Sequence, residues 1–157
     1  MKNIFRLIRP THWIKNFFVF MPLFFGGAIT DISMLTNAVI AFIAFSFIAS
    51  AIYCYNDIID VEDDRRHSVK RHRPIASGAV SVSAAYLIMI VMILISISTA
   101  MLAGSRWCSL ATVIAIYFLM EIAYCRILKL YAIVDVIILS AGFVLRILAG
   151  SVATGII

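Results

Sequence analysis

The most polar stretch of the chain carries acidic and amide side chains at helical spacing. Its members are Asn56, Asp57, Asp60, Asp63 and Asp64. On a helix, at about 100° per residue, they share one face within an arc of roughly 120°. Like charges on one face repel one another, and carboxylate and amide oxygens suit Mg²⁺ together with substrate phosphates. The spacing therefore predicts a site for Mg²⁺ and a diphosphate. The alternative is a solvated acidic loop that the adjacent arginines neutralise.

Basic side chains follow the acidic stretch directly. They are Lys70, Arg71 and Arg73, and we expect Arg9 and Lys15 on the same side of the membrane. Phosphate oxygens that a metal leaves uncovered need cationic partners, and arginine can hold them with two hydrogen bonds. The basic side chains are therefore candidates for binding the diphosphate. The alternative is a basic loop that binds lipid headgroups and sets the topology.

A third polar set lies further along the chain, at the link between two apolar runs: Tyr124, Arg126, Lys129 and Asp135. Arg146 lies deeper in apolar sequence. Because ionisable groups at membrane depth are costly unless they face a partner or a wet cavity, we expect Arg146 to face the bundle interior. A packing role with a contact to backbone carbonyls is its structural alternative. Glu121 is open to the same two interpretations.

The composition indicates whether the protein is soluble or lies in a membrane. Hydrophobic residues make up 64% of the 157 residues and charged residues only 13%, against about 45–50% and about 25% in soluble domains. This excludes an ordinary soluble enzyme, a disordered tail, a collagen-like fibre and a disulfide scaffold. The net charge of +5 fits the basic cytoplasmic loops of a membrane protein, so we expect no nucleic-acid partner.

The apolar runs predict an all-α membrane protein, a bundle of about five transmembrane helices. Such runs approach the length that crosses a bilayer of roughly 30 Å. The predicted spans are residues 13–29, 37–55, 84–103, 110–124 and 131 to the last residue.

The basic residues between these runs predict an orientation. Residues 1–16 hold four Lys or Arg residues, residues 57–82 hold five, and residues 125–130 hold two. The opposite links, residues 30–36 and 104–107, hold none and one. Since cytoplasmic loops collect Lys and Arg, we expect the N-terminus and the 57–82 loop in the cytoplasm, with the protein in the cell inner membrane.

The polar stretch also carries a resemblance to a known family. NDIIDVEDDRRHSVKRHRPIASG resembles the first aspartate-rich motif, NDxxDxxxD, of the UbiA-type intramembrane prenyltransferase superfamily. RPTHWIKN and YCRILKLYAIVDV are similar to two further segments of that family. The resemblance implies that Asn56, Asp57, Asp60 and Asp64 bind Mg²⁺.

The resemblance also implies roles for individual side chains. Asp60, Asp64 and Lys15 would be catalytic. The substrate diphosphate would be bound by Lys15, Lys70, Arg71, Arg73, Tyr124 and Lys129.

Within the superfamily, the motifs are closest to the decaprenyl-phosphate phosphoribosyltransferase branch. That resemblance implies transfer of phosphoribose from phosphoribosyl diphosphate to a polyprenyl phosphate, with Mg²⁺ as cofactor. One alternative is an aromatic polyprenyltransferase that uses a polyprenyl diphosphate and an acceptor such as 4-hydroxybenzoate. The other is a non-enzymatic membrane fragment, such as part of a transporter or a lipid-binding module.

The resemblance finally gives an expectation about completeness. The family has about nine membrane helices and a second aspartate-rich motif in its later half. Residues 1–157 resemble the N-terminal half of such a domain and lack the second motif. We therefore expect a truncated domain that needs a C-terminal half for turnover.

Overall fold

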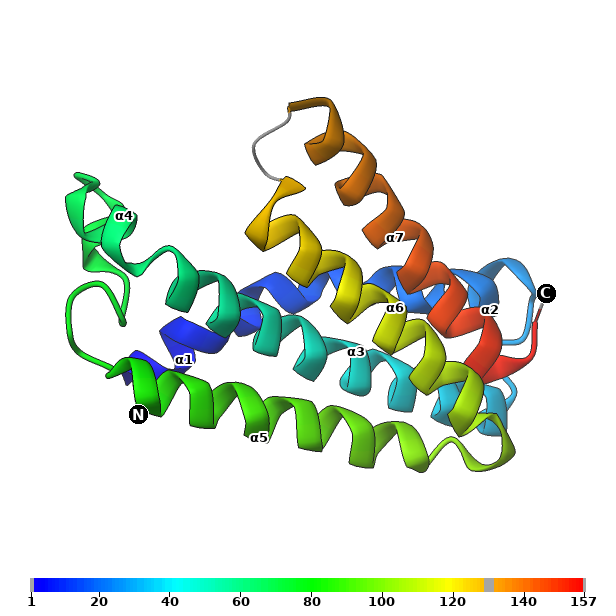
Figure 1. Ribbon diagram of the computed structural model, residues 1–157. Helices are drawn as coiled ribbons and strands as arrows, with labels where there is room; N and C mark the ends of the chain where they lie inside the picture. Colours follow the sequence, from blue (N-terminus) through cyan, green and yellow to red (C-terminus); the bar gives the residue numbers. More distant parts are fainter. Residues whose placement is uncertain (1, 129–131, 157) are drawn as a thin grey trace.

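The computed structural model describes residues 2–128 and 132–156, and within these ranges the chain is helical with no strand (Figure 1). The prediction of an all-α fold is confirmed. The elements in chain order are α1 (Lys2–Ile8), η1 (Pro10–Phe20), α2 (Met21–Phe25), α3 (Ile32–Ile59), α4 (Val61–Arg66), η2 (Lys70–His72), α5 (Val82–Met101), η3 (Gly104–Arg106), α6 (Trp107–Arg126) and α7 (Ala132–Thr154).

Four helical segments in the described part are long and apolar enough to cross a membrane. They are Ile32–Ile59, Val82–Met101, Gly104–Arg126 and Ile133–Thr154. They correspond to the last four of the five predicted spans. Three of them begin earlier than predicted. Polar caps start two of these: Asp31 accepts from the Met34 N–H at 2.9 Å, and Ser81 accepts from the Ala84 N–H at 3.2 Å.

The first predicted span takes a different form from the other four. Pro10–Phe20 is a 3₁₀ helix and Met21–Phe25 is a short α-helix. A turn at Gly27, whose φ is 65°, stops this segment before Ile29. At about 2.0 Å per residue in a 3₁₀ helix and 1.5 Å in an α-helix, its contour is about 30 Å. The segment is long enough to cross a bilayer, so the total of five spans stays a prediction.

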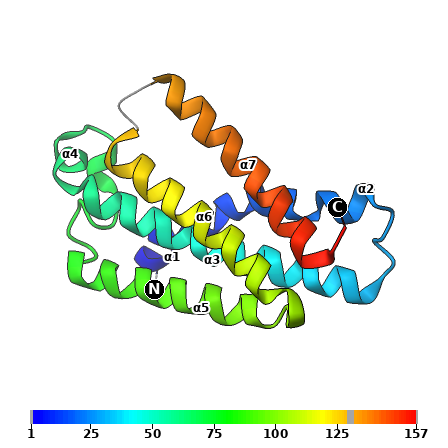
Figure 2. The same ribbon diagram turned by 45° about the vertical axis from the view of Figure 1, so that its right-hand side comes forward.

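Helix α3 is the centre of the bundle. Two thirds of its most apolar window is buried, against about a fifth for the three other spans. Small side chains such as Ala41, Ala44 and Ser46 are completely buried and allow neighbouring helices to approach closely. Figures 1 and 2 show α5 beside α3 along its length, while α7 leads away from the bundle toward its N-terminal end.

One glycine fixes the approach of α7 to η1. A Cβ atom added at Gly150 would lie only 1.8 Å from the Val19 carbonyl oxygen. No side chain fits at this crossing, so the backbone of α7 packs directly against the backbone of η1.

The outer faces remain apolar. Leu87, Ile90 and Leu94 on α5 are exposed, as are Leu119 on α6 and Leu139 on α7. Large exposed apolar side chains on several helices are typical of surfaces that face lipid. The chain is therefore a multi-pass membrane protein.

Candidate functional site

The acidic motif lies where α3 ends and α4 begins. The prediction of one continuous helix is wrong here, because Asp60 has φ −85° and ψ 5° and separates the two helices. Helical hydrogen bonds nevertheless cross the break: Asp60 N–H donates to the Asn56 carbonyl at 3.0 Å, and Asp64 N–H donates to the Asp60 carbonyl at 2.8 Å. The i, i+4 spacing of the motif is therefore retained across the kink.

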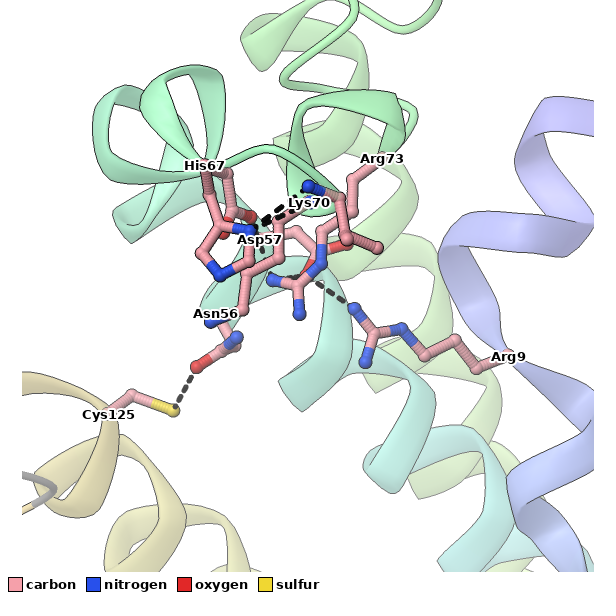
Figure 3. Close-up of polar contacts among 9 residues, drawn as sticks. Arg9, Asn56, Asp57, His67, Lys70, Arg73 and Cys125 are labelled. Carbon is pink, nitrogen blue, oxygen red and sulfur yellow. Dashed lines mark hydrogen bonds and ion pairs between the residues drawn. The ribbon is translucent and has the colours of Figure 1, made fainter.

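Asp57 is the buried centre of the site, with 1% of its surface exposed. Its Oδ1 accepts from Arg9 Nη2 at 2.6 Å and from Arg73 Nη1 at 3.2 Å. Figure 3 shows Arg9 reaching Asp57 from the N-terminal segment, while Arg73 approaches from the loop after α4. Asp57 Oδ2 is buried and has no hydrogen-bond partner among the described residues. One carboxylate oxygen is thus neutralised and the other is left for a ligand.

Asp64 joins this cluster through Arg73. Its Oδ2 accepts from Arg73 Nη1 at 2.7 Å, and Asp64 is 2% exposed. Two predicted metal ligands, Asp57 and Asp64, are therefore brought together. Asn56 faces α6, where its Oδ1 accepts from the Cys125 thiol at 3.4 Å (Figure 3). Asp60 is half-buried at the kink.

The described residues contain no group of three or more His, Cys, Asp or Glu side chains placed to hold a metal ion. The site still fits Mg²⁺, which commonly takes only one or two protein carboxylates and completes its shell with water and substrate phosphates. A buried carboxylate oxygen without a partner costs free energy unless a ligand satisfies it. Asp57 Oδ2 is such an oxygen, so the observed donor set accepts a hard cation.

A pocket of about 630 Å³ opens beside Asp57. It is lined by Lys2, Phe5, Arg6, Arg9, Pro10, Thr11, His12, Asp57, Arg73 and Pro74. Burial, followed by the charges of Arg9 and Lys15, lowers the pKa of His12, and its Nδ1 lies 3.1 Å from the Tyr53 hydroxyl. A pocket with three arginines around one carboxylate can hold a polyanion together with a cation.

The backbone at Arg9 supports this arrangement. Arg9 has φ 49° and ψ 59°, a left-handed conformation that costs an arginine free energy and that stands directly before Pro10. The guanidinium of Arg9 also lies 5.0 Å from the centre of the Tyr53 ring. The strained backbone turns the chain from α1 into η1 at the residue that binds Asp57.

The other predicted cations lie apart from this pocket. Lys70 and Arg71 are exposed on η2 and do not line it. Lys15 lines a second, deeper pocket with Glu121 and Arg146. Tyr124 is half-buried and close enough to Asp135 to interact with it. Lys129 lies outside the described residues. Among the described cations that were predicted to bind the diphosphate, Arg9 and Arg73 therefore contact the buried carboxylates.

Arg146 faces the bundle interior, as predicted, and is 7% exposed. Its Nη1 donates to the Gly142 carbonyl at 2.6 Å, which is the carbonyl contact of the packing alternative. Its Nε donates to Asn16 Oδ1 at 2.8 Å, and its Nη2 donates to the Tyr117 hydroxyl at 3.1 Å. This network links α7 to η1 and α6.

The sequence interpretation missed Arg6 and His12 in the first pocket and Tyr53 in the second. It also missed the partnership of Asn16 with Arg146. One signal was available for Tyr53, which precedes Asp57 by four residues and therefore shares its helix face. The RPTHWIKN segment contained His12 and Asn16, but it gave no indication of what they contact.

The sequence pattern of the UbiA prenyltransferase family matches residues 17–157. The chain belongs to this family. The predicted family resemblance is therefore confirmed. A decaprenyl-phosphate phosphoribosyltransferase from Corynebacterium glutamicum is 41% identical over 156 residues, which cover 98% of this chain and 47% of that protein. A protein of the same name from Mycobacterium tuberculosis is 38% identical over 158 residues, covering 98% and 51% respectively.

The fold agrees with this membership. The structure of a UbiA homologue from Archaeoglobus fulgidus bound to GPP and Mg²⁺ has a TM-score of 0.77 and 25% identity, covering 98% of this chain and 54% of that chain. This UbiA chain thus spans about half the length of its curated and structural relatives. The acidic pocket is therefore the pocket of a UbiA-family protein.

Proposed function

We propose that this UbiA chain is part of an integral-membrane transferase that moves phosphoribose from phosphoribosyl diphosphate to a polyprenyl phosphate. The observation that carries the proposal is the 41% identity, over 98% of the chain, to a decaprenyl-phosphate phosphoribosyltransferase. Because the chain spans about half of that relative, the activity is proposed for the complete protein. We also propose the inner membrane as its location, with the acidic pocket facing the cytoplasm, where a water-soluble donor would be available.

The metal would be held by the acidic motif. Asn56, Asp57, Asp60 and Asp64 are the proposed ligands, with Asp57 Oδ2 as the best-placed oxygen. Mg²⁺ bound there would supply positive charge to a diphosphate group. Asp57 and Asp64 are already held in place by Arg73, so the protein orients these carboxylates before any ligand binds.

The chain's own cations would stabilise the leaving group. In the transfer, the bond between the anomeric carbon of ribose and the diphosphate breaks, and a lipid phosphate oxygen forms the new bond to that carbon. The leaving diphosphate gains negative charge, and fixed cations aimed at it lower the barrier. Arg9 and Arg73 line the pocket for this purpose, and we assign supporting roles to Lys15, Lys70, Arg71, Tyr124 and Lys129. Because a lipid phosphate is already an anion, this step needs no general base.

The test is an assay on membranes from cells that express the gene in full. Diphosphate release should require Mg²⁺, phosphoribosyl diphosphate and decaprenyl phosphate together. Membranes carrying the Asp57→Asn variant serve as the control for background activity. Release without a lipid phosphate acceptor would contradict the proposal.

An aromatic prenyltransferase is the second candidate, because the 25% identical structural relative carries the prenyl diphosphate GPP with Mg²⁺. Both reactions use a diphosphate leaving group. Turnover of 4-hydroxybenzoate with a polyprenyl diphosphate, but not of phosphoribosyl diphosphate, would favour this second function.

A further inference from the structure

A second polar pocket lies deeper in the bundle than the acidic pocket. Its volume is about 140 Å³, and side chains from η1, α3, α6 and α7 line it. The polar ones are Lys15, Tyr53, Tyr117, Glu121 and Arg146. Tyr53 precedes Asp57 by one helical turn, about 6 Å along α3. Since the Tyr53 hydroxyl also contacts His12 of the first pocket, this side chain forms the boundary between the two pockets.

Glu121 is the unusual member of this deeper pocket. It lies within the α6 span, where a carboxylate is costly unless it faces a partner or a wet cavity. Its carboxylate accepts no hydrogen bond from the described residues, and the nearest opposing charges are those of Arg146 and Lys15. The carboxylate therefore stands in the pocket as a free hydrogen-bond acceptor.

Two parts of the pocket beside Glu121, the Arg146 side chain and the wall at Gly142, are held in place by their neighbours. Arg146 is fixed by Asn16, the Gly142 carbonyl and Tyr117. An added Cβ at Gly142 would lie 3.1 Å from Arg146 Nη1 and 3.8 Å from Glu121 Oε1. Gly142 therefore forms the wall beside both charged groups, and the pocket exists partly because this wall has no side chain.

We propose that the deeper pocket binds the ribose hydroxyl groups of the donor. Glu121 accepts hydrogen bonds from the hydroxyls, and Lys15 and Tyr53 donate to them. A carboxylate accepts hydrogen bonds from hydroxyl groups and repels phosphate oxygens. Glu121 therefore favours the ribose hydroxyls over the phosphate groups of the donor, which Lys15 and Arg146 alone would attract. In the donor the ribose is joined to the diphosphate by one oxygen. A sugar site one helical turn from Asp57 is therefore within reach of a diphosphate bound there.

The inference rests on the proposed function, and a binding experiment separates the two. The complete protein in detergent, with Mg²⁺ present, is titrated with phosphoribosyl diphosphate, with inorganic diphosphate and with a donor analogue that lacks both ring hydroxyls. The variants are Glu121→Gln, which preserves size but removes the charge, and Gly142→Ala, which adds a Cβ to the wall. Glu62→Gln is the matched control, because Glu62 is exposed and pairs only with Arg65 at 2.7 Å among the described residues.

Glu121→Gln should weaken phosphoribosyl diphosphate binding about tenfold or more. It should leave the binding of inorganic diphosphate and of the dihydroxyl-deleted analogue unchanged, and Gly142→Ala should show the same selectivity. Glu62→Gln should bind all three ligands like the unmodified protein. Thermal unfolding of each variant checks that the fold is intact.

Two results would overturn the sugar assignment. If Glu121→Gln tightens donor binding, the pocket holds an anionic group that the carboxylate repels. If Glu121→Gln binds the donor like the unmodified protein, the pocket does not contact the sugar. In both cases the unmodified protein still turns over the donor, so the proposed function survives. If the unmodified protein does not use phosphoribosyl diphosphate, the proposed function fails and the sugar site fails with it.

Discussion

Arg73 Nη1 lies 3.2 Å from Asp57 Oδ1 and 2.7 Å from Asp64 Oδ2, so one nitrogen atom joins two buried carboxylates. Asp57 and Asp64 are on different helices, one before and one after the kink at Asp60. The repulsion expected within the acidic motif is therefore relieved in part by arginine. The simple alternative of a solvated acidic loop does not describe these two carboxylates, because both are buried.

Replacing Arg73 should lower the free energy of unfolding, because Arg73 joins Asp57 and Asp64. Arg73→Met leaves two buried carboxylates with less compensation, and breaking a buried ion pair costs up to about 3–5 kcal/mol. We expect less than that, because the Arg73 side chain is 25% exposed. Thermal unfolding in detergent measures the loss. Arg71→Met, a change at an exposed neighbour, should unfold at the original temperature, and an equal loss in both variants would contradict the bridging role.

Asp60→Asn should abolish Mg²⁺-dependent donor binding in the complete protein. Asp60 stands centrally in the motif, and the amide removes the negative charge that a cation needs. Calorimetric titration with phosphoribosyl diphosphate, with and without Mg²⁺, gives the result. The matched control is Asp63→Asn, which alters an exposed carboxylate in the same stretch. Unchanged Mg²⁺ dependence in Asp60→Asn would remove this residue from the proposed metal site.

Gly150→Ala should weaken the packing of α7 on η1. The added Cβ would lie 1.8 Å from the Val19 carbonyl oxygen, so the helices must separate. Overpacking of this kind costs about 1–3 kcal/mol, and occasionally more. The unfolding temperature should fall for Gly150→Ala and fall further for Gly150→Ser. Wild-type stability in both variants would show that this crossing is looser than the structure has it.

Cysteine labelling tests the orientation. Cys108 is exposed near the start of α6, whereas Cys54 and Cys125 are buried. Ser77 is exposed in the loop between α4 and α5, which we predict to be cytoplasmic. A membrane-impermeant maleimide added to intact spheroplasts should label native Cys108. It should fail to label Ser77→Cys in a Cys108→Ser background until the membrane is opened. The reverse pattern would invert the predicted topology.

The sequence by itself determined the features that depend on neighbouring residues. Long apolar runs predicted five spans, and four of these are long apolar helices in the described residues, because span length is a local property of the chain. The i, i+4 spacing of Asn56, Asp60 and Asp64 is kept across the kink between α3 and α4, since helical hydrogen bonds continue across it. The depth of Arg146 in apolar sequence was enough to predict that it faces inward, because an unpartnered charge cannot face lipid.

Only the tertiary structure decided which side chains meet. Arg9 pairs with Asp57 across 48 positions, and Arg146 binds Asn16 across 130. Such pairings depend on how each helix is rotated and how the helices cross, and helical periodicity within one segment specifies neither. The place of Glu121 in a second pocket follows from the same packing. The 3₁₀ form of Pro10–Phe20 was likewise not predicted from the sequence. The chemistry of the acidic motif could be predicted from neighbouring residues. Its arginine partners and the deeper pocket form only when distant helices pack together.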